Sequence, residues 1–226
     1  RPYYEHALQS CKTIIDFVNP WFSHYVSNIV CSIIEKRMKT EKEYGFLLLN
    51  YLIEKNPNEV RICMPQLVPF IAGYINDISP QIKTNSYDAL NKLFKCSKNM
   101  DLDSFIPIVL KGIKDHSTTY DAVEALASCV FVQNVEAPAL SVTMPIVLRG
   151  LNDKKTATRR LTCVIIDNMC KLIEHPKEIL PYYSTLKQAL ERCDDTMSDP
   201  EARKVSSRAL NTLKESCANN ENAIFH

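Results

Sequence analysis

Apolar residues recur at helical spacing along nearly the whole chain, and no segment alternates apolar and polar residues for long. Three clear stripes lie within Phe46–Ile53, Leu67–Ile75 and Leu161–Leu172. Spacings of three and four residues place such side chains on one face of an α-helix. Short break signals separate the stripes: Asn56-Pro57, Ser79-Pro80, 99–103, 115–119, Asp153 and His175-Pro176. The pattern predicts about eleven helices joined by tight turns.

Two segments of the chain superimpose on each other, which indicates internal repeats. Asp77-Ile78-Ser79-Pro80 and the apolar pattern that follows it match Ser198-Asp199-Pro200 and the pattern that follows there. The two prolines are 120 residues apart, or three periods of about 40. A degenerate copy begins at Asp153. Proline at a helix start loses no hydrogen bond, and a preceding Asp or Ser can cap the free N–H groups.

A helix pair of about 40 residues cannot bury its apolar face alone, so such pairs stack. A motif of Asp, Pro and a later Lys or Arg that recurs with this period is the HEAT signature. We therefore expect an all-α fold: an α-solenoid of about five HEAT repeats in a right-handed superhelical stack. The solenoid is expected over residues 1–218, followed by a tail or linker at 219–226.

Composition narrows the class of protein. The chain has 226 residues, a net charge of +1 and 46% hydrophobic residues, which excludes a disordered chain. Its four glycines are scattered, so no phosphate-binding loop is present. The apolar runs fall far short of the roughly 20 residues that span a membrane. The chain lacks a signal peptide and an initiator Met, so a fragment of a larger protein is expected.

Nine cysteines occur without any CxxC pair. Most lie in apolar helical stretches, as Cys163 does. This pattern favours reduced thiols that act as small core residues, and it disfavours a zinc site. Reduced thiols indicate a reducing compartment, here the cytoplasm.

The sequence also resembles one family more closely than HEAT proteins in general. The segments that carry the resemblance are 131–141, 144–152, 164–176 and 198–203. They are similar to the N-terminal HEAT-repeat domain of translation elongation factor 3, a fungal-type ribosomal ATPase of the ABC-F class. The resemblance covers roughly Pro20 to Leu213. A related HEAT region occurs in the general-control translational activator, so this activator is an alternative parent protein for the chain.

The resemblance implies a non-catalytic ribosome-binding scaffold in a translation elongation ATPase that promotes release of tRNA from the E site. The implied partners are proteins and rRNA of the small-subunit head, and the other domains of the parent protein. No cofactor, metal, membrane or small-molecule substrate is expected. The alternatives are a segment of the activator that stimulates the initiation factor 2α kinase, and a generic protein-binding HEAT scaffold.

Basic residues gather at one predicted turn. We interpret this cluster as a site that binds rRNA phosphates; the alternative is a solvated repeat turn. Its members are Arg149, Lys154, Lys155, Arg159 and Arg160. A second cluster, Lys36, Arg37, Lys39 and Lys42, is diluted by acidic neighbours and is interpreted as a solvated turn.

Two further features call for an interpretation. In the pair Asp167-Asn168, within an apolar helix, we expect a buried Asn that bridges neighbouring repeats rather than a catalytic group. Aromatic residues cluster near the start: Tyr3, Tyr4, Trp21 and Tyr25. They are expected to pack on a preceding repeat, and an exposed binding face is the alternative.

Overall fold

The structure, a computed structural model, describes residues 2–36 and 38–218. Within these ranges it contains thirteen α-helices, three 3₁₀-helices and no strand. Contacts divide the chain into two compact units, residues 1–97 and 98–226. The predicted tail at 219–226 lies outside the described residues.

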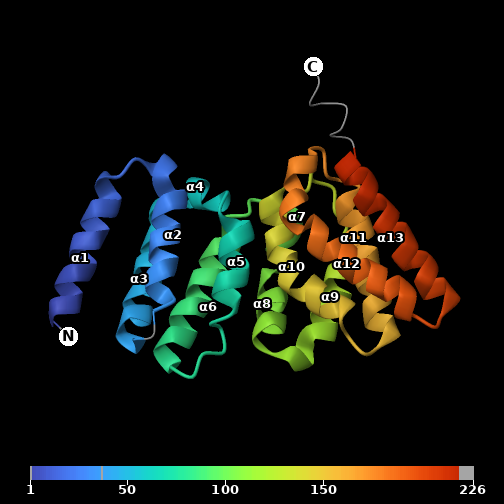
Figure 1. The fold of residues 1–226 in the computed structure, drawn as a ribbon, viewed down its shortest axis with the longest axis horizontal. Coiled ribbons are helices and arrows are strands. Elements are labelled where there is room, and N and C mark those ends of the chain that lie inside the picture. Colours follow the sequence, from blue (N-terminus) through green and yellow to red (C-terminus); the bar gives the residue numbers. More distant parts are fainter. Residues whose placement is uncertain (1, 37, 219–226) are drawn as a thin grey trace, which may run out of the picture. The chain divides into compact units, whose positions relative to one another are not determined.

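The first unit pairs α2 with α3 and α5 with α6 (Figure 1). Helix α3 also contacts α1 and α6, so these three helices form one layer, and α4 bridges α2, α3 and α6. The bounds are α1 Pro2–Phe17, η1 Pro20–Phe22, α2 Ser23–Ile34, α3 Lys39–Lys55, α4 Pro57–Arg61, α5 Met64–Ala72 and α6 Pro80–Lys95.

The second unit pairs α8 with α9, α10 with α11 and α12 with α13. Helix α11 contacts both α9 and α13 in one layer, and α10 contacts both α8 and α12 in the other. The bounds are α7 Met100–Asp103, α8 Ile106–Lys114, η2 His116–Thr118, α9 Thr119–Ser128, α10 Ala137–Leu151, α11 Thr156–Cys170, η3 Pro176–Glu178, α12 Leu180–Thr196 and α13 Pro200–Ala218.

The described pairs number five, two in the first unit and three in the second, and the prediction of an all-α fold of HEAT-type pairs is confirmed. The two helices beyond the expected eleven are α4 and α7. Both are one-turn helices that lie where the sequence predicted breaks, at Asn56-Pro57 and at 99–103. A segment this short leaves no periodicity to detect.

Aspartates fold the turns within the pairs. The Asp77 carboxylate accepts a bond of 2.8 Å from the N–H of Ser79, and Asp153 accepts one of 2.7 Å from Lys155. Asp115 and Asp199 make the same kind of contact before α9 and α13. Ser79, in contrast, provides no cap, because its hydroxyl donates to Glu43. In these four turns an Asp is therefore the residue that closes the turn.

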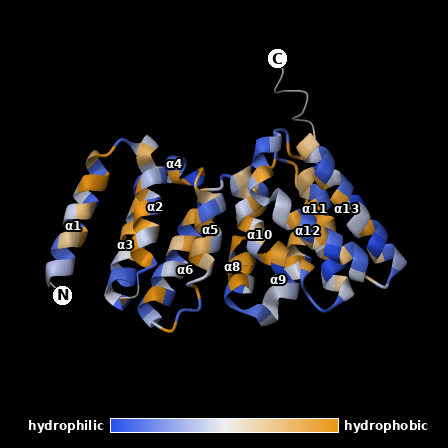
Figure 2. Ribbon diagram, viewed as in Figure 1, coloured by the Kyte–Doolittle hydropathy of each residue, from blue (hydrophilic) through white to orange (hydrophobic). Residues whose placement is uncertain are grey.

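Small residues set the spacing within the pairs. Ala89 and Ala209 are fully buried, and their short side chains allow close helix contact. A Cβ on Gly112 would lie 2.8 Å from the Ala122 Cβ, and one on Gly150 would lie 2.3 Å from the Thr162 Oγ1. Apolar residues run along α8 and α10, whereas polar residues prevail along α13 (Figure 2). Among the described helices, none is both long and apolar enough to cross a bilayer.

Candidate functional site

Arg149 of the predicted basic cluster is committed to the protein itself. Its guanidinium donates to the carbonyl oxygens of Gly112 and Ile113 and to the Thr119 hydroxyl. Those carbonyls lie in the last turn of α8, where a helix lacks internal donors. Burial lowers the pKa of the Arg149 guanidinium, which still stays charged at neutral pH. Arg149 therefore caps α8 and ties the end of α10 to it.

Arg159 is also engaged within the chain. It donates to the Thr196 hydroxyl at 2.9 Å, at the end of α12, and to the Thr156 hydroxyl at 3.3 Å. Its side chain is half-buried, and the buried Nε has no partner within the described residues. Arg159 therefore connects α11 with the neighbouring helix pair.

The other three residues of the cluster face solvent. Lys154 and Lys155 are exposed on the turn between α10 and α11, and Arg160 is exposed in the first turns of α11. In the part of the chain that the structure describes, none of the three forms an ion pair with a carboxylate. The turn itself is held by the bond from the Lys155 N–H to Asp153. The structure thus presents three cations, two on a fixed turn and one on the helix that follows it.

The neighbouring turn extends this basic edge. Lys111 and Lys114 are exposed in the last turn of α8, which Arg149 joins to α10. Lys111 stands 38 residues before Arg149, at the equivalent place in its own helix pair. Reasoning from sequence missed these two residues, although aligning the cluster with the preceding repeat reveals them. We call Lys111, Lys114, Lys154, Lys155 and Arg160 the basic edge.

The third turn of the second unit, between α12 and α13, differs from the first two in its charge. A cavity of about 760 Å³ opens there, between the end of α12 and α13. Its lining mixes the carboxylates Asp194 and Asp195 with Arg203, Lys204 and Arg208, the last of which pairs with Asp167. The Ser207 hydroxyl already donates to Asp194 at 2.6 Å. Mixed charge does not favour an anionic ligand, so the basic edge ends before this turn.

The pair Asp167-Asn168 bridges repeats, but through the other residue than predicted. The Asp167 side chain is fully buried, and Asn168 is half-exposed. The Asp167 carboxylate pairs with Lys171 at 2.7 Å and with the Arg208 Nε at 3.0 Å, and the Thr212 hydroxyl donates to it at 2.7 Å. The prediction of a buried Asn is wrong, and the buried residue is the Asp. Its carboxylate accepts from three donors at once, two of them cationic, and a neutral amide oxygen has fewer acceptor sites and no charge.

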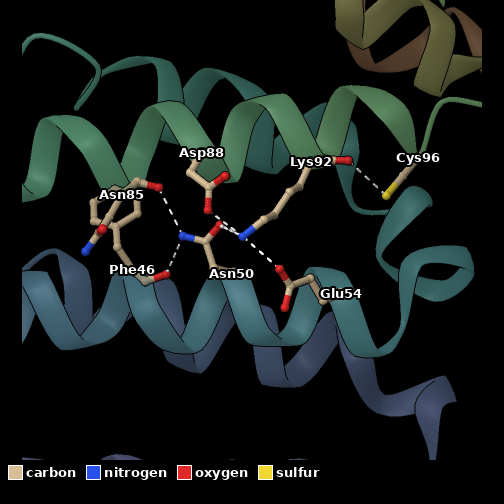
Figure 3. A network of polar contacts seen from close by, with 7 residues as sticks. All are labelled: Phe46, Asn50, Glu54, Asn85, Asp88, Lys92 and Cys96. Carbon is tan, nitrogen blue, oxygen red and sulfur yellow. Dashed lines mark hydrogen bonds and ion pairs between the residues drawn. The ribbon is translucent and has the colours of Figure 1, made fainter.

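A similar bridge holds α3 against α6 in the first unit (Figure 3). The Asn50 amide donates to the carbonyl oxygens of Phe46 and Asn85, both at 3.0 Å. Lys92 donates to the Asn50 oxygen at 3.2 Å, pairs with Glu54 at 2.8 Å and also binds Asp88. Both bridges are structural, since their hydrogen bonds and ion pairs join one helix to the next.

The aromatic residues near the start do not form one cluster. Tyr3 and Tyr4 lie at the beginning of α1, whereas Trp21 and Tyr25 follow its end. Tyr4 stacks on Tyr44 with a centroid distance of 5.4 Å. Trp21 is 80% exposed and Tyr25 64% exposed. What covers these two side chains in the complete protein stays a prediction.

The second predicted basic cluster disperses in the structure. Lys39 pairs with Glu43 at 3.6 Å, and Lys42 lies 5.6 Å from the centre of the Tyr74 ring. Lys36 is exposed, and Arg37 lies outside the described residues. Across the described residues, no three His, Cys, Asp or Glu side chains converge as metal ligands would. The nine cysteines are all free thiols.

Comparison with known proteins gives a consistent result. Residues 116–223 match the family described as "Elongation factor 3/GNC1 HEAT repeat". Elongation factor 3 of Pneumocystis carinii is 35% identical over 203 residues, 89% of this chain and 20% of that protein. Elongation factor 3A of Saccharomyces cerevisiae is 32% identical over 209 residues, and elongation factor 3 of Phytophthora infestans 32% over 208; each covers 92% of this chain and 20% of its relative. The chain thus spans about a fifth of the length of these relatives.

Proposed function

Because residues 116–223 match the elongation factor 3/GNC1 HEAT-repeat family, we propose that the chain is a ribosome-binding scaffold of an elongation factor 3-like protein. The scaffold is non-catalytic. It positions the remaining domains of the parent protein, where ATP hydrolysis and release of E-site tRNA take place. Its partners are rRNA and proteins of the small-subunit head.

The basic edge is the observation that carries this proposal. Lys154, Lys155 and Arg160 present three charges without carboxylate partners on a turn whose backbone is fixed and on the start of α11. Lys111 and Lys114 continue the positive surface on the adjacent turn. A cation that neutralises a phosphate releases counterions, and a preformed edge loses little conformational freedom on binding.

Arg149 and Arg159 support this surface without touching RNA in our proposal. Arg149 fixes the two turns relative to each other through the carbonyls of α8, and Arg159 fixes the start of α11 against the end of α12. The five residues of the predicted cluster thus divide into three that contact the ribosome and two that hold them in place.

The test is co-sedimentation of the chain with purified ribosomes over a salt series. Lys154→Glu/Lys155→Glu/Arg160→Glu is expected to abolish most binding at moderate salt. Replacing the three by Gln removes about three phosphate contacts, so the slope of log affinity against log salt should fall by roughly 2 to 3.

The matched control is Lys95→Glu/Lys177→Glu/Lys214→Glu, which changes the net charge equally at exposed positions that are not part of the basic edge. This control should sediment nearly as the parent chain does. Absence of co-sedimentation at low salt, or equal loss in both triple variants, would contradict the proposal.

A further inference from the structure

The connection between α9 and α10 differs from the other connections between helix pairs. A one-turn helix lies between α3 and α5, between α6 and α8, and between α11 and α12. Residues 129–136 instead contain no helical turn. We call residues 129–136 the extended loop. Part of this loop carries the family resemblance, and the proposed function leaves it without a role.

Hydrogen bonds to α7 and to the residues after α11 fix the extended loop. The Asp101 carboxylate accepts from the N–H groups of Val132 and Gln133, both at 2.8 Å. The Gln133 side chain accepts from the N–H of Met100 at 2.8 Å. Further along, the Val135 N–H donates to the carbonyl of Leu172 at 2.9 Å. The loop is thus ordered before any partner arrives, and the entropy cost of binding is low.

Apolar side chains nevertheless point away from this ordered loop. Val130 is 78% exposed, Val132 72% and Met100 of the adjacent α7 73%. Single exposed apolar residues are common on protein surfaces. Here two lie on the loop and one on the adjacent helix, and such a group of exposed apolar residues on an ordered backbone is typical of contact surfaces.

A cavity of about 450 Å³ adjoins the loop, and its charge indicates what it accepts. Val130, Phe131 and Leu172 line its apolar part, and Asn168 and Lys171 line its polar part. No carboxylate is among its lining residues. Lys171 is 53% exposed, and its partner Asp167 is also paired with Arg208, so two cations share one carboxylate. Lys171 is the one charged residue among those that line the cavity, and its positive charge favours an acidic partner.

We propose that the extended loop and this cavity form a docking site for a protein segment that carries apolar side chains next to carboxylates. The apolar side chains contact Val130 and Val132 and enter the cavity, and a carboxylate pairs with Lys171. Lys171 follows the end of α11, whereas the basic edge lies at its beginning, about 22 Å away along a helix of 15 residues. The two surfaces can therefore be tested separately.

The test uses the ¹⁵N-labelled chain and two amidated peptides, acetyl-Glu-Leu-Phe-Asp-Leu and acetyl-Lys-Leu-Phe-Lys-Leu. The acidic peptide should shift the amide resonances of residues 129–133 and of Lys171, and should bind at least about tenfold more tightly than the basic one. Val130→Asp places a carboxylate beside Lys171 and should weaken this binding by about tenfold or more. Val132→Ser tests the apolar contact without a new charge and should also weaken binding.

The control is Ile78→Asp, because Ile78 is 98% exposed in the first unit and should leave peptide binding unchanged. A peptide preference that is absent or reversed would overturn the proposal, as would unchanged binding in both loop variants. A twelve-residue polyuridine oligonucleotide that shifts these resonances while the acidic peptide does not would assign the site to RNA instead.

Discussion

At the scale of single residues, the contribution of a buried polar group depends on how completely its partners satisfy it. Asp167 is buried with three donors, two of them cationic. Burial by itself raises the pKa of this carboxyl, but the hydrogen bonds from Lys171 and Thr212 and the charge of Arg208 outweigh it, so the pKa lies below its ordinary value. The ionised form is therefore favoured in the folded chain.

We expect Asp167→Asn to destabilise the chain by about 2 kcal/mol at pH 7, because it removes hydrogen bonds to charged partners. Since the folded-state pKa is depressed, this stabilisation is present above the unfolded-state pKa of about 3.9 and is lost as pH falls through the folded-state value. Urea unfolding at pH 7 and pH 3 should show a smaller difference between variant and parent at pH 3. Asn168→Ala, at a half-exposed position, is the control, and a pH-independent difference would contradict the assignment.

Gly150 gives a second prediction at this scale. Ala is favoured over Gly inside a helix by about 1 kcal/mol. A Cβ at Gly150 would lie 2.3 Å from Thr162 Oγ1 and 3.1 Å from Val123 Cγ2, and such overpacking costs about 1–3 kcal/mol. Thermal unfolding should therefore show Gly150→Ala to be destabilising. Thr162→Ala should recover part of the loss in the double variant, and Gly73→Ala, at an exposed glycine, should be neutral or stabilising.

At the scale of elements, hydrophobic spacing predicted the long helices because each buries one continuous stripe. The repeated Asp and Pro marked their starts, as at α6 and α13. The one-turn helices α4 and α7 were missed because they bury one side chain each, Val60 and Leu102. The density of basic residues in the sequence was enough to predict the basic cluster. The roles of Arg149 and Arg159 depend on which carbonyl or hydroxyl group a neighbouring helix places beside them. Sequence alone does not show these tertiary contacts.

The cap on α8 gives a prediction about an element. Arg149→Met should destabilise the second unit by about 1–2 kcal/mol, because the carbonyls of Gly112 and Ile113 lose a charged donor. Arg160→Met should change stability by less than about 0.5 kcal/mol, because Arg160 is exposed. Denaturant unfolding followed by circular dichroism measures both. Equal effects in the two variants would contradict the division into supporting and contacting residues.

At the scale of the whole molecule, the net charge of +1 is an average over surfaces that differ. The basic edge carries exposed cations on two turns, and the third turn of the same unit carries Asp194 and Asp195 beside basic residues. The total charge therefore says little about an RNA partner, and the distribution along the turns is the informative quantity.

The nine thiols report on the integrity of the whole fold. Six are buried and three, Cys11, Cys31 and Cys217, are half-buried. Burial raises the pKa of Cys31 and of Cys170 to about 12, so these thiols react slowly even where a reagent reaches them. Ellman's reagent at pH 8 should therefore modify at most three thiols in the native chain and nine in urea. Cys11→Ser and Cys217→Ser should each reduce the amplitude of the fast phase, and rapid modification of six or more native thiols would contradict this packing.

The two polar bridges between neighbouring helices have a consequence for the order in which the helix pairs assemble. By the 120-residue offset, Asp88 of α6 occupies the place that Arg208 occupies in α13. If α6 stacked on α11 in place of α13, the carboxylate of Asp88 would face the buried carboxylate of Asp167. The charge carried by α6 is thus incompatible with the position that α13 fills on α11, and this repulsion disfavours that one misplaced arrangement.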